Sequence, residues 1–344
     1  MSELRYIIDQ KEGISEKHLE QLFKLMQENR KEILLHEPPS AEYFRIFWNL
    51  PQEKSKEKKW VLVLNDEILI GYGYVSWNIM FDNLDIGYFW CFIKKEHRRK
   101  GYGTALLQQL CRLFPQQIRI VQTESFENTD GEKFVANLKE EYQSQMVISI
   151  SDIRNFDKEK VSIEAKQLKQ RASEKGYKII FSNARDLAKN IDYPKYVEMV
   201  EEIWNDMPRE ELSDEDEILT PERHNEYLRR AMDNGYEILT FIAITKETEK
   251  PIGLTCTNIN KFQPLIAYQE DTGILREHRG NGLGLTLKYQ MLNKLLTETN
   301  TKYWETGNAG SNEHMLRIND KLGYKKYTSI KITEFMKEEW QNFL

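Results

Sequence analysis

Two spacings of apolar residues alternate along the chain and predict helices and strands in turn. Leu22 and Met26 lie four residues apart, in a stretch whose apolar positions favour one face of a helix over residues 15–29. The runs at 60–64 and 68–77 are rich in β-branched and aromatic residues, which favours two neighbouring strands. The chain is therefore expected to be a mixture of helices and strands.

Further elements follow from the same spacings, with proline and glycine marking many of their ends. In the first half we predict strands at 6–8, 60–64, 68–77, 88–93, 118–123 and 146–150, and helices at 15–29, 40–50, 104–114 and 132–142. In the second half we predict strands at 177–181, 238–245, 252–258, 265–275, 302–306 and 324–332, and helices at 186–205, 220–234, 285–296 and 313–322.

The order of elements in the first half recurs in the second. Each half reads as a strand, helices, three strands, a glycine-rich loop, a helix, a strand, a helix and a strand. A hairpin region joined to a strand–loop–helix–strand unit favours a mixed, mostly antiparallel sheet flanked by helices, which is an α/β fold class. We therefore predict tandem domains at 1–155 and 176–344, joined by a linking helix at 156–175.

A glycine-rich loop stands at the strand-to-helix turn of each half. Arg279 is followed by Gly282 and Gly284, and the same Arg-x-x-Gly-x-Gly spacing occurs 181 residues earlier, from Arg98 to Gly103. Such a turn lets successive backbone N–H groups point into one hollow, and the following helix adds the positive end of its dipole. Each loop predicts a seat for a phosphate or pyrophosphate, and the pair indicates a duplicated domain.

Length, charge and cysteine content narrow the class of protein. The 344 residues suffice for two domains with a core each, and the net charge of −6 disfavours a general nucleic-acid binder. No apolar run approaches the roughly 20 residues of a membrane span, and the N-terminus has no apolar signal region. Cys91, Cys111 and Cys256 favour reduced core thiols in a cytoplasmic protein over a disulfide or a metal site, so no metal is expected.

The element order, together with the two Arg-x-x-Gly-x-Gly loops, resembles the GNAT superfamily of acyl-CoA-dependent N-acetyltransferases. The resemblance covers nearly the whole chain, once in each half. The chain is therefore similar to tandem proteins of the mycothiol synthase type. In the second half, residues 306–312 and Leu322-Gly323-Tyr324 carry the similarity. It implies two tandem GNAT-like domains and acetyl-CoA as the acyl donor, with the pyrophosphate of coenzyme A held by the glycine loop.

The resemblance also assigns cofactor-binding positions in both halves. In the second half these are Gly273, Ile274 and Leu275 on the strand, Arg279, Gly280, Asn281, Gly282, Leu283, Gly284 and Leu285 in the loop, and Asn312 and Asn319 on the next helix. In the first half they are Phe92 and Ile93 on the strand and Arg98, Arg99, Lys100, Gly101, Tyr102, Gly103 and Thr104 in the loop.

Two departures from the family pattern bear on the chemistry. Many members place a tyrosine four residues before the glycine of the Leu-Gly-Tyr element, as an acid for the departing thiolate, whereas this chain has Asn319 there. The first half lacks the Leu-Gly-Tyr stop after its 132–142 helix. We therefore expect the chemistry in the second half, and a first half that kept its cofactor loop but lost or changed its reaction.

Acetyl transfer needs a held thioester, a polarised carbonyl oxygen and an amine without its extra proton. A lysine-like amine has a pKa of about 10.4, so a base is useful at pH 7. Glu270 and Asp271 are the candidate bases. As neighbours on a strand they are expected on opposite faces, so at most one faces the substrate, and we favour Glu270. A backbone N–H near Leu275 is the candidate oxyanion donor. Asn308, at a strand end, is either a substrate contact or a turn residue.

Three functions are compatible with these patterns. The first is an N-acetyltransferase acting on the amine of a small molecule, with no nucleic-acid or membrane partner. The second is a non-catalytic acyl-CoA-binding sensor or scaffold, which the missing tyrosine favours. The third, a dinucleotide-binding protein, is disfavoured because a hairpin precedes each glycine loop. The acceptor amine and the oligomeric state stay open.

Overall fold

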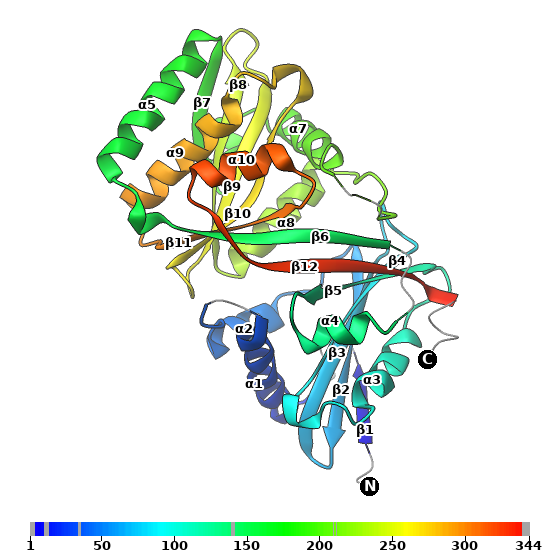
Figure 1. The fold of residues 1–344 in the computed structure, drawn as a ribbon. Coiled ribbons are helices and arrows are strands. Elements are labelled where there is room, and N and C mark those ends of the chain that lie inside the picture. The colour runs from blue at the N-terminus through cyan, green and yellow to red at the C-terminus, as the bar shows by residue number, and fades with distance from the viewer. Residues whose placement is uncertain are drawn as a thin grey trace. The chain divides into compact units, whose positions relative to one another are not determined.

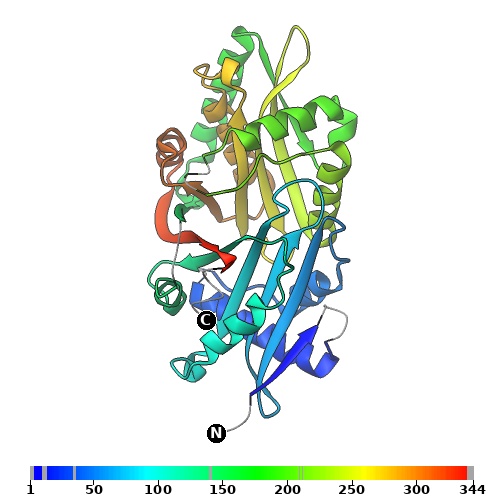
Figure 2. The ribbon, with the colours of Figure 1, turned by 90° about the vertical axis from the view of Figure 1, so that its right-hand side faces the viewer.

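The chain forms two compact units in a computed structural model that describes residues 4–9, 14–33, 36–138, 142–208, 210 and 212–338 (Figure 1, Figure 2). The first unit comprises Met1–Met146, Arg209–Asp216 and Thr328–Leu344, and the second comprises Val147–Pro208 and Glu217–Tyr327. Strands and helices follow one another in the predicted order in both halves of the sequence, which confirms the α/β class and the repeat.

The sheet of the first unit has the strand order β1-β2-β3-β4-β5-β12. Val61 and Val63 of β2 pack with α3 on one face, and Leu62 and Leu64 pack with α1 and α2 on the other. The continuous apolar run at 60–64 therefore reflects a strand that is buried on both sides. The elements are β1 Leu4–Asp9, α1 Glu16–Ile33, α2 Ala41–Asn49, β2 Lys56–Asn65, β3 Ile68–Asn78, β4 Ile86–Ile93, η2 Lys95–His97, α3 Tyr102–Cys111, β5 Ile120–Phe126, α4 Asp130–Val135 and β12 Lys325–Met336.

The sheet of the second unit has the strand order β6-β11-β10-β9-β8-β7 around a single apolar core. Helices α5 and α9 pack against each other, as Figure 1 shows, while Ile203 of α7 lies against Gly273 of β10. The elements are β6 Tyr142–Asp152, η3 Ile153–Asn155, α5 Lys158–Glu174, β7 Tyr177–Asn183, α6 Leu187–Asn190, α7 Tyr193–Asn205, α8 Pro221–Asp233, β8 Tyr236–Thr245, β9 Pro251–Asn260, β10 Ile266–Ile274, η4 Arg276–His278, α9 Leu283–Glu298, β11 Tyr303–Ala309 and α10 Glu313–Lys321.

Each half of the chain gives its last strand to the other unit. Strand β12 pairs antiparallel with β5, from Ile330 opposite Phe126 to Met336 opposite Ile120. Strand β6 neighbours β11, and its residues from Val147 onward belong to the second unit. The predicted domains at 1–155 and 176–344 follow the repeat along the sequence, whereas the compact units are assembled from exchanged strands.

Strands β4 and β5 of the first unit separate partway along β4, ahead of the glycine loop. Strands β4 and β5 pair in parallel only from Ile86 opposite Ile120 to Tyr88 opposite Gln122. The Thr123 hydroxyl then donates to the Phe89 carbonyl at 2.8 Å, and no later pair joins the two strands. Beyond this point the sheet is split, and the split faces the start of α3.

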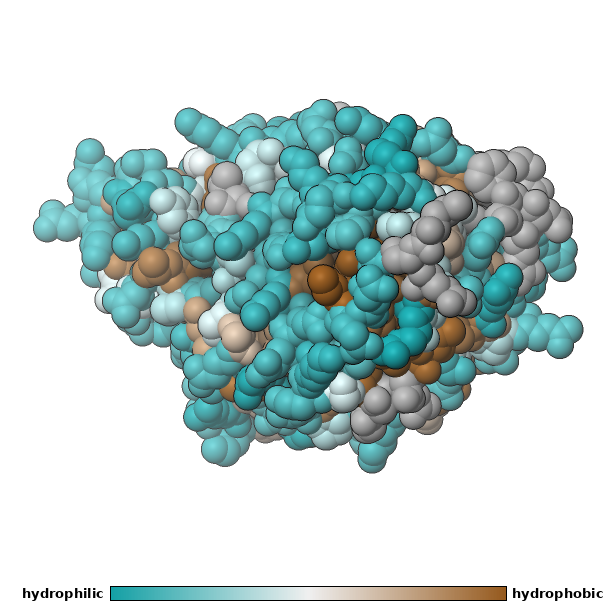
Figure 3. All heavy atoms as spheres, turned by 90° about the horizontal axis from the view of Figure 1, so that it is seen from below, coloured by the Kyte–Doolittle hydropathy of each residue, from teal (hydrophilic) through white to brown (hydrophobic). Residues whose placement is uncertain are grey.

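Hydrophilic side chains cover most of the molecular face seen in Figure 3, with hydrophobic ones gathered in small separate areas. Among the exposed apolar residues, Ile79, Met80 and Leu84 lie on the connection between β3 and β4. No helix in the described ranges is long and apolar enough to cross a lipid bilayer.

Candidate functional site

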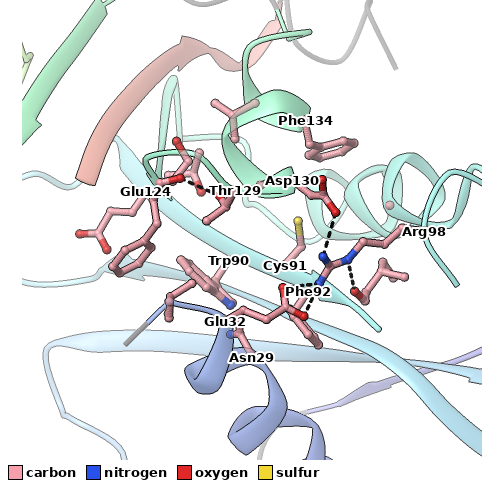
Figure 4. A pocket seen from close by; sticks show the side chains of 18 of the residues that line it. Asn29, Glu32, Trp90, Cys91, Phe92, Arg98, Glu124, Thr129, Asp130 and Phe134 are labelled. Carbon is pink, nitrogen blue, oxygen red and sulfur yellow. Dashed lines mark hydrogen bonds and ion pairs between the residues drawn. The ribbon is translucent and has the colours of Figure 1, made fainter. Parts of the chain in front are cut away.

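Arg98 fixes the first glycine loop to the strand that precedes it. Its Nε donates to the carbonyl oxygen of Ile93, the last residue of β4, at 2.8 Å. Its two terminal nitrogens reach Glu32 of α1 at 2.8 Å and Asp130 of α4 at 3.0 Å, as Figure 4 shows. The guanidinium is therefore engaged with protein groups, and its part in this loop is to hold the backbone in place.

The backbone of the first loop is shaped to receive an anion. Arg99 and Gly101 have φ of 61° and 82°, which turns the chain so that α3 starts immediately after Gly101. A Cβ on Gly101 would meet no atom within 4 Å, so the space above this residue is open. Within the part of the chain that the structure describes, no protein acceptor takes the N–H groups of Gly101, Gly103 and Thr104. Free N–H groups at a helix start attract phosphate.

A cavity of about 380 Å³ joins this loop to the split between β4 and β5. The volume lies in the range of roughly 300–1,000 Å³ that is typical of small-molecule sites. Among the predicted first-half residues, seven line it: Phe92, Ile93, Arg98, Arg99, Gly101, Gly103 and Thr104. Lys100 instead donates to the Glu96 carbonyl at 3.0 Å, and Tyr102 packs on the core under α3.

Glu124 and Cys91 lie on the two diverging strands and line the same cavity (Figure 4). Withdrawal from water raises the pKa of the Glu124 carboxyl, and the positive charge of Arg30 opposes that shift. No described residue donates a hydrogen bond to this carboxyl. Burial raises the pKa of the Cys91 thiol to about 12, so the protonated thiol is favoured near neutral pH.

A second cavity, of about 190 Å³, lies beside the first and shares Glu124 and Trp90 with it. It contains the charged side chains of Arg30 and Lys58, and most of its other lining residues are aromatic. Asn29, Ile33 and Phe126 also border both cavities. The two spaces therefore meet at one carboxyl group.

The second glycine loop repeats the backbone of the first. Nε of Arg279 donates to the carbonyl oxygen of Ile274 at 2.9 Å, as Arg98 does to Ile93. Gly280 and Gly282 have φ of 77° and 78°, and a Cβ on either would meet no atom within 4 Å. The N–H groups of this loop are thus presented at the start of α9 in the same way as those of the first loop at α3.

Asp206 lies beside the second glycine loop. Arg276 and Arg279 both pair with the carboxylate of Asp206, and their hydrogen bonds hold its pKa below the usual range. A cavity of about 180 Å³ borders these three residues together with Ile274 and Leu275. Asn281 donates to the His278 carbonyl at 3.0 Å, so its side chain also serves the loop itself.

Glu270 and Asp271 line one common recess, which corrects the expectation that they point to opposite faces. A β-bulge interrupts the register between Gln269 and Thr272, and an extra residue in a bulge breaks the alternation of side chains. Glu270 accepts a hydrogen bond from Asn258 at 2.9 Å, and Asp271 accepts one from Trp204 Nε1 at 2.8 Å.

The enclosed recess beside Glu270 is too small for an amine substrate, although Glu270 itself is exposed to solvent. Glu270 is reached by solvent, yet protein surrounds its carboxyl on most sides. The resulting loss of hydration and the nearby Asp271 raise its pKa to about 7. The recess measures about 20 Å³, and a single water needs about 10–15 Å³. It therefore admits about one water.

The strand and helix positions predicted in the second half are largely engaged within the protein. The N–H of Leu275 donates to the Ile252 carbonyl at 2.9 Å, so the sheet already uses the expected oxyanion donor. Asn312 caps α10 by accepting from the Met315 N–H at 3.2 Å. Asn319 donates to Asn308 at 2.6 Å, and these two side chains bind each other.

Lys288 completes this buried network. Its side chain is 1% exposed, its Nζ donates to Asn319 at 2.7 Å, and burial lowers its pKa to about 7. The rings of Trp304 and Tyr324 lie 5.8 and 5.4 Å from the same nitrogen. The position predicted to face the cofactor thus serves as the partner of a buried lysine.

Glu124 lines both cavities of the first unit and is a residue that sequence reasoning passed over. It stands 181 residues before Glu305, the same spacing that separates the two glycine loops. Glu305 accepts a hydrogen bond from the Tyr327 hydroxyl at 2.9 Å, whereas Glu124 lies between the two cavities of the first unit. The spacing was visible in the sequence, but it gave no sign of this difference in surroundings.

The sequence profile of the acetyltransferase (GNAT) family matches residues 19–135 and 197–324, one region in each half. The chain belongs to this family. The two matched regions confirm the tandem GNAT interpretation, and family membership supports acyl transfer from an acyl-CoA.

Two solved structures have a similar fold. A tandem GNAT protein from the clavulanic acid biosynthesis pathway, solved without AcCoA, is 17% identical, with a TM-score of 0.75 over 97% of this chain and 99% of that one. A GCN5-related N-acetyltransferase from Sphaerobacter thermophilus is 13% identical, with a TM-score of 0.63 over 96% of each chain. A comparison with curated protein sequences gives no match.

Proposed function

We propose that the protein transfers the acetyl group of acetyl-CoA to the primary amine of a small molecule, and that both substrates bind in the first unit. The observation that carries this proposal is the meeting of two cavities at Glu124. One leads to the glycine loop and the other is lined by aromatic rings. A donor and an acceptor could therefore meet beside one carboxyl group.

Backbone groups of the first unit would hold the donor. The N–H groups at the start of α3 would receive the pyrophosphate, and the split between β4 and β5 would receive the pantetheine arm. The backbone N–H of Lys94, the residue that follows β4, points towards β3 and donates to the Ile70 carbonyl at 2.8 Å. Because N–H groups alternate along a strand, those of Cys91 and Ile93 point the other way, into the split. Either could donate to the carbonyl oxygen of the thioester as it becomes negative.

Glu124 would accept the proton of the acceptor amine. A raised pKa makes this carboxylate a stronger base, and it has no competing hydrogen bond from the described residues. The amine nitrogen then forms its bond to the carbonyl carbon, and the carbon–sulfur bond breaks. Coenzyme A leaves as a thiolate and takes up the second proton, which the nitrogen releases as it becomes an amide, so no tyrosine acid is needed.

The second unit supplies the alternative location that the sequence favours. Its loop backbone matches the first, and the pKa of Glu270 near 7 suits a base. The recess beside that carboxyl, however, admits about one water. A non-catalytic acyl-CoA sensor is the second candidate function, because Asn319 replaces the tyrosine acid and binds Lys288.

Matched glycine variants test the location of the donor. Gly101 and Gly282 have nearly equal φ and equally open space, so Gly101→Ala and Gly282→Ala carry the same backbone cost. Each adds a methyl group over one phosphate seat. We expect calorimetry with acetyl-CoA to show at least a tenfold loss of affinity for Gly101→Ala. If only Gly282→Ala loses binding, the donor belongs to the second unit, and if neither does, the proposed use of the loops is wrong.

Thiol release separates an enzyme from a sensor. We expect coenzyme A to be released when acetyl-CoA is mixed with a suitable amine, and Glu124→Gln to suppress that release while acetyl-CoA still binds. A protein that binds acetyl-CoA tightly and releases no thiol with a broad set of amines would be a sensor or scaffold.

A further inference from the structure

The acceptor cavity of the first unit is walled by aromatic rings from five elements. They are Tyr43, Phe44 and Phe47 of α2, Trp60 of β2, Tyr72 and Tyr74 of β3, Tyr88 and Trp90 of β4, and Phe126 of β5. The rings form continuous walls, with centroids 5.0 Å apart for Trp60 and Tyr74 and 6.1 Å apart for Tyr74 and Tyr88. Burial raises the pKa of Tyr72 to about 12, so its hydroxyl stays neutral. Such walls favour a flat, apolar group.

The size of the cavity limits that group. The cavity measures about 190 Å³, and an apolar cavity of about 150 Å³ is enough to bind benzene. One aromatic ring with a short chain therefore fits, whereas a peptide or an oligosaccharide would extend far beyond the walls.

The charges in the cavity are unequal. Lys58 Nζ lies over the rings of Tyr74 and Trp60, 3.4 and 4.6 Å from their centroids, so these faces already hold a cation. Arg30 of α1 lines the same cavity and makes no hydrogen bond or ion pair with any described residue. Burial raises the pKa values of Tyr72, Tyr74 and Glu124, and the positive charge of Arg30 partly opposes each rise, as expected of a guanidinium that lies close to these groups.

Two cationic side chains and one carboxyl group line the cavity, so a polycation would be repelled and is a poor ligand. Glu124 is the carboxyl that borders the cavity, and it also borders the donor cavity. An ammonium is therefore best placed at Glu124, where it can lose its proton beside the thioester. The Arg30 guanidinium, which has no partner among the described residues, is complementary to an anionic group such as a carboxylate.

We propose that the acceptor is an aromatic primary amine that also carries an anionic group, as an aromatic amino acid does. This inference rests on the proposed function, because it names the substrate class of the same site. The ring packs among the aromatic walls, the amine meets Glu124, and the anionic group pairs with Arg30.

Four amines test the three parts of this assignment with the wild-type protein and acetyl-CoA. L-phenylalanine has all three groups, phenethylamine lacks the carboxylate, L-alanine lacks the ring, and spermidine is a polycation. We expect kcat/KM from thiol release to be at least tenfold higher for phenylalanine than for each of the others. A higher kcat/KM with spermidine or alanine would overturn the proposal.

Arg30→Gln tests the anionic contact. We expect it to raise KM for phenylalanine about tenfold and to leave KM for phenethylamine unchanged, because only the first substrate has a carboxylate. Lys31→Gln is the matched control, since it removes the same charge from the next residue of α1, which does not line the cavity. Equal effects of Arg30→Gln on both substrates would show a merely structural role and contradict the assignment.

Calorimetry with acetyl-CoA distinguishes a wrong substrate class from a wrong proposed function. If acetyl-CoA binds and its affinity depends on Gly101, but none of the four amines is acetylated, this substrate class is wrong while the donor site stands. If acetyl-CoA does not bind at all, the proposed function fails, whatever the acceptor.

Discussion

Glu124 and Lys288 are ionisable residues that the fold has drawn away from water, one in each unit. Burial raises the pKa of the first and lowers that of the second to about 7, because both prefer their neutral forms in the protein. Lys288 has a hydrogen-bond partner in Asn319, whereas no described residue donates to Glu124. A carboxyl that lies beside two cavities and has no hydrogen-bond donor among the described residues fits a role in chemistry, and a bonded lysine inside the core fits a role in structure.

Glu124→Gln should trade activity for stability. If Glu124 is the base, the variant loses roughly a hundredfold or more in kcat, and its kcat/KM loses the limb that rises with pH through the Glu124 pKa. The tyrosines that face this carboxyl, Tyr74 and Tyr88, stay neutral over that range because burial raises their pKa values. Steady-state rates from pH 5 to 9 measure both effects.

The same variant should lose activity but gain stability at high pH. A raised folded-state pKa means that folding weakens as pH rises from the unfolded value of about 4.3 through the folded value. Glu124→Gln should therefore melt like the wild type near pH 4.5 and at a higher temperature than the wild type at pH 8. Equal melting temperatures at both pH values would show that Glu124 is well solvated.

Lys288→Met should change how stability depends on pH. The folded-state pKa of about 7 lies below the unfolded value of about 10.4, so the burial cost is complete below pH 7 and fades as pH rises towards 10. We expect the free energy of unfolding of the wild type to gain on that of the variant between pH 7 and pH 9.5. Urea titrations at both pH values measure this change, and a constant difference would contradict it.

The two arginine-anchored loops show that the repeat extends to individual contacts between elements. In each unit the motif arginine donates through Nε to the end of the preceding strand, at 2.8 and 2.9 Å. The remaining guanidinium nitrogens then bind carboxylates from different elements, Glu32 and Asp130 in the first unit and Asp206 in the second. One motif therefore anchors the loop in both units, while its neighbours determine the space beside it.

Gly273→Ala should disrupt the contact between β10 and α7. An added Cβ would lie closer than 3.0 Å to Cγ2 of Ile203, which is 4% exposed and cannot move aside freely. We expect a loss of about 1–3 kcal/mol in the free energy of unfolding. Urea titration measures it, and the loss should be smaller in an Ile203→Ala background because the clash is gone.

Gly284→Ala is the control for this substitution. Its nearest neighbour is Cδ1 of Ile318 at 3.6 Å, an ordinary contact, and the residue lies in the first turn of α9. Alanine there should leave stability within about 1 kcal/mol of the wild type. Similar large losses at both positions would mean that crowding by Ile203 is not the cause.

The exchange of final strands ties the folding of each unit to the distant end of the chain. Phe335 of β12 is 0% exposed and belongs to the apolar core around α3, although it follows α3 by more than 200 residues in the sequence. Sheet pairing over such a separation carries a loop-closure cost, which the paired backbone and the buried side chains must offset. The first unit is therefore incomplete until the C-terminal segment has joined it.

Truncation after Tyr327 should destabilise the first unit in preference to the second. It removes the segment Thr328–Leu344, which belongs to the first unit. The edge of β5 that pairs with β12 is then left unpaired. Hydrogen exchange followed by mass spectrometry should show faster exchange in α3 and β4, with α9 and β9 little changed. Truncation after Glu338 keeps β12 and is the control. Equal loss of protection in both units would contradict this assignment of the strand.

Much of the fold was determined by local sequence. Alternating and helical spacings predicted nearly all of the elements, and glycines with positive φ marked both loops, because these features depend on neighbouring residues alone. The duplication was legible for the same reason, since Arg98 and Arg279 recur in the same local context.

Only the tertiary structure decided where the site could be. Whether Leu275 has a free N–H, whether Glu270 and Asp271 share a face, and whether Glu124 borders a cavity all depend on strand register, a bulge and packing from distant elements. The strand exchange is equally invisible locally, because either final strand has the pattern of a sheet member. Sequence sets what each segment can form, and long-range packing determines which surfaces remain open to a ligand.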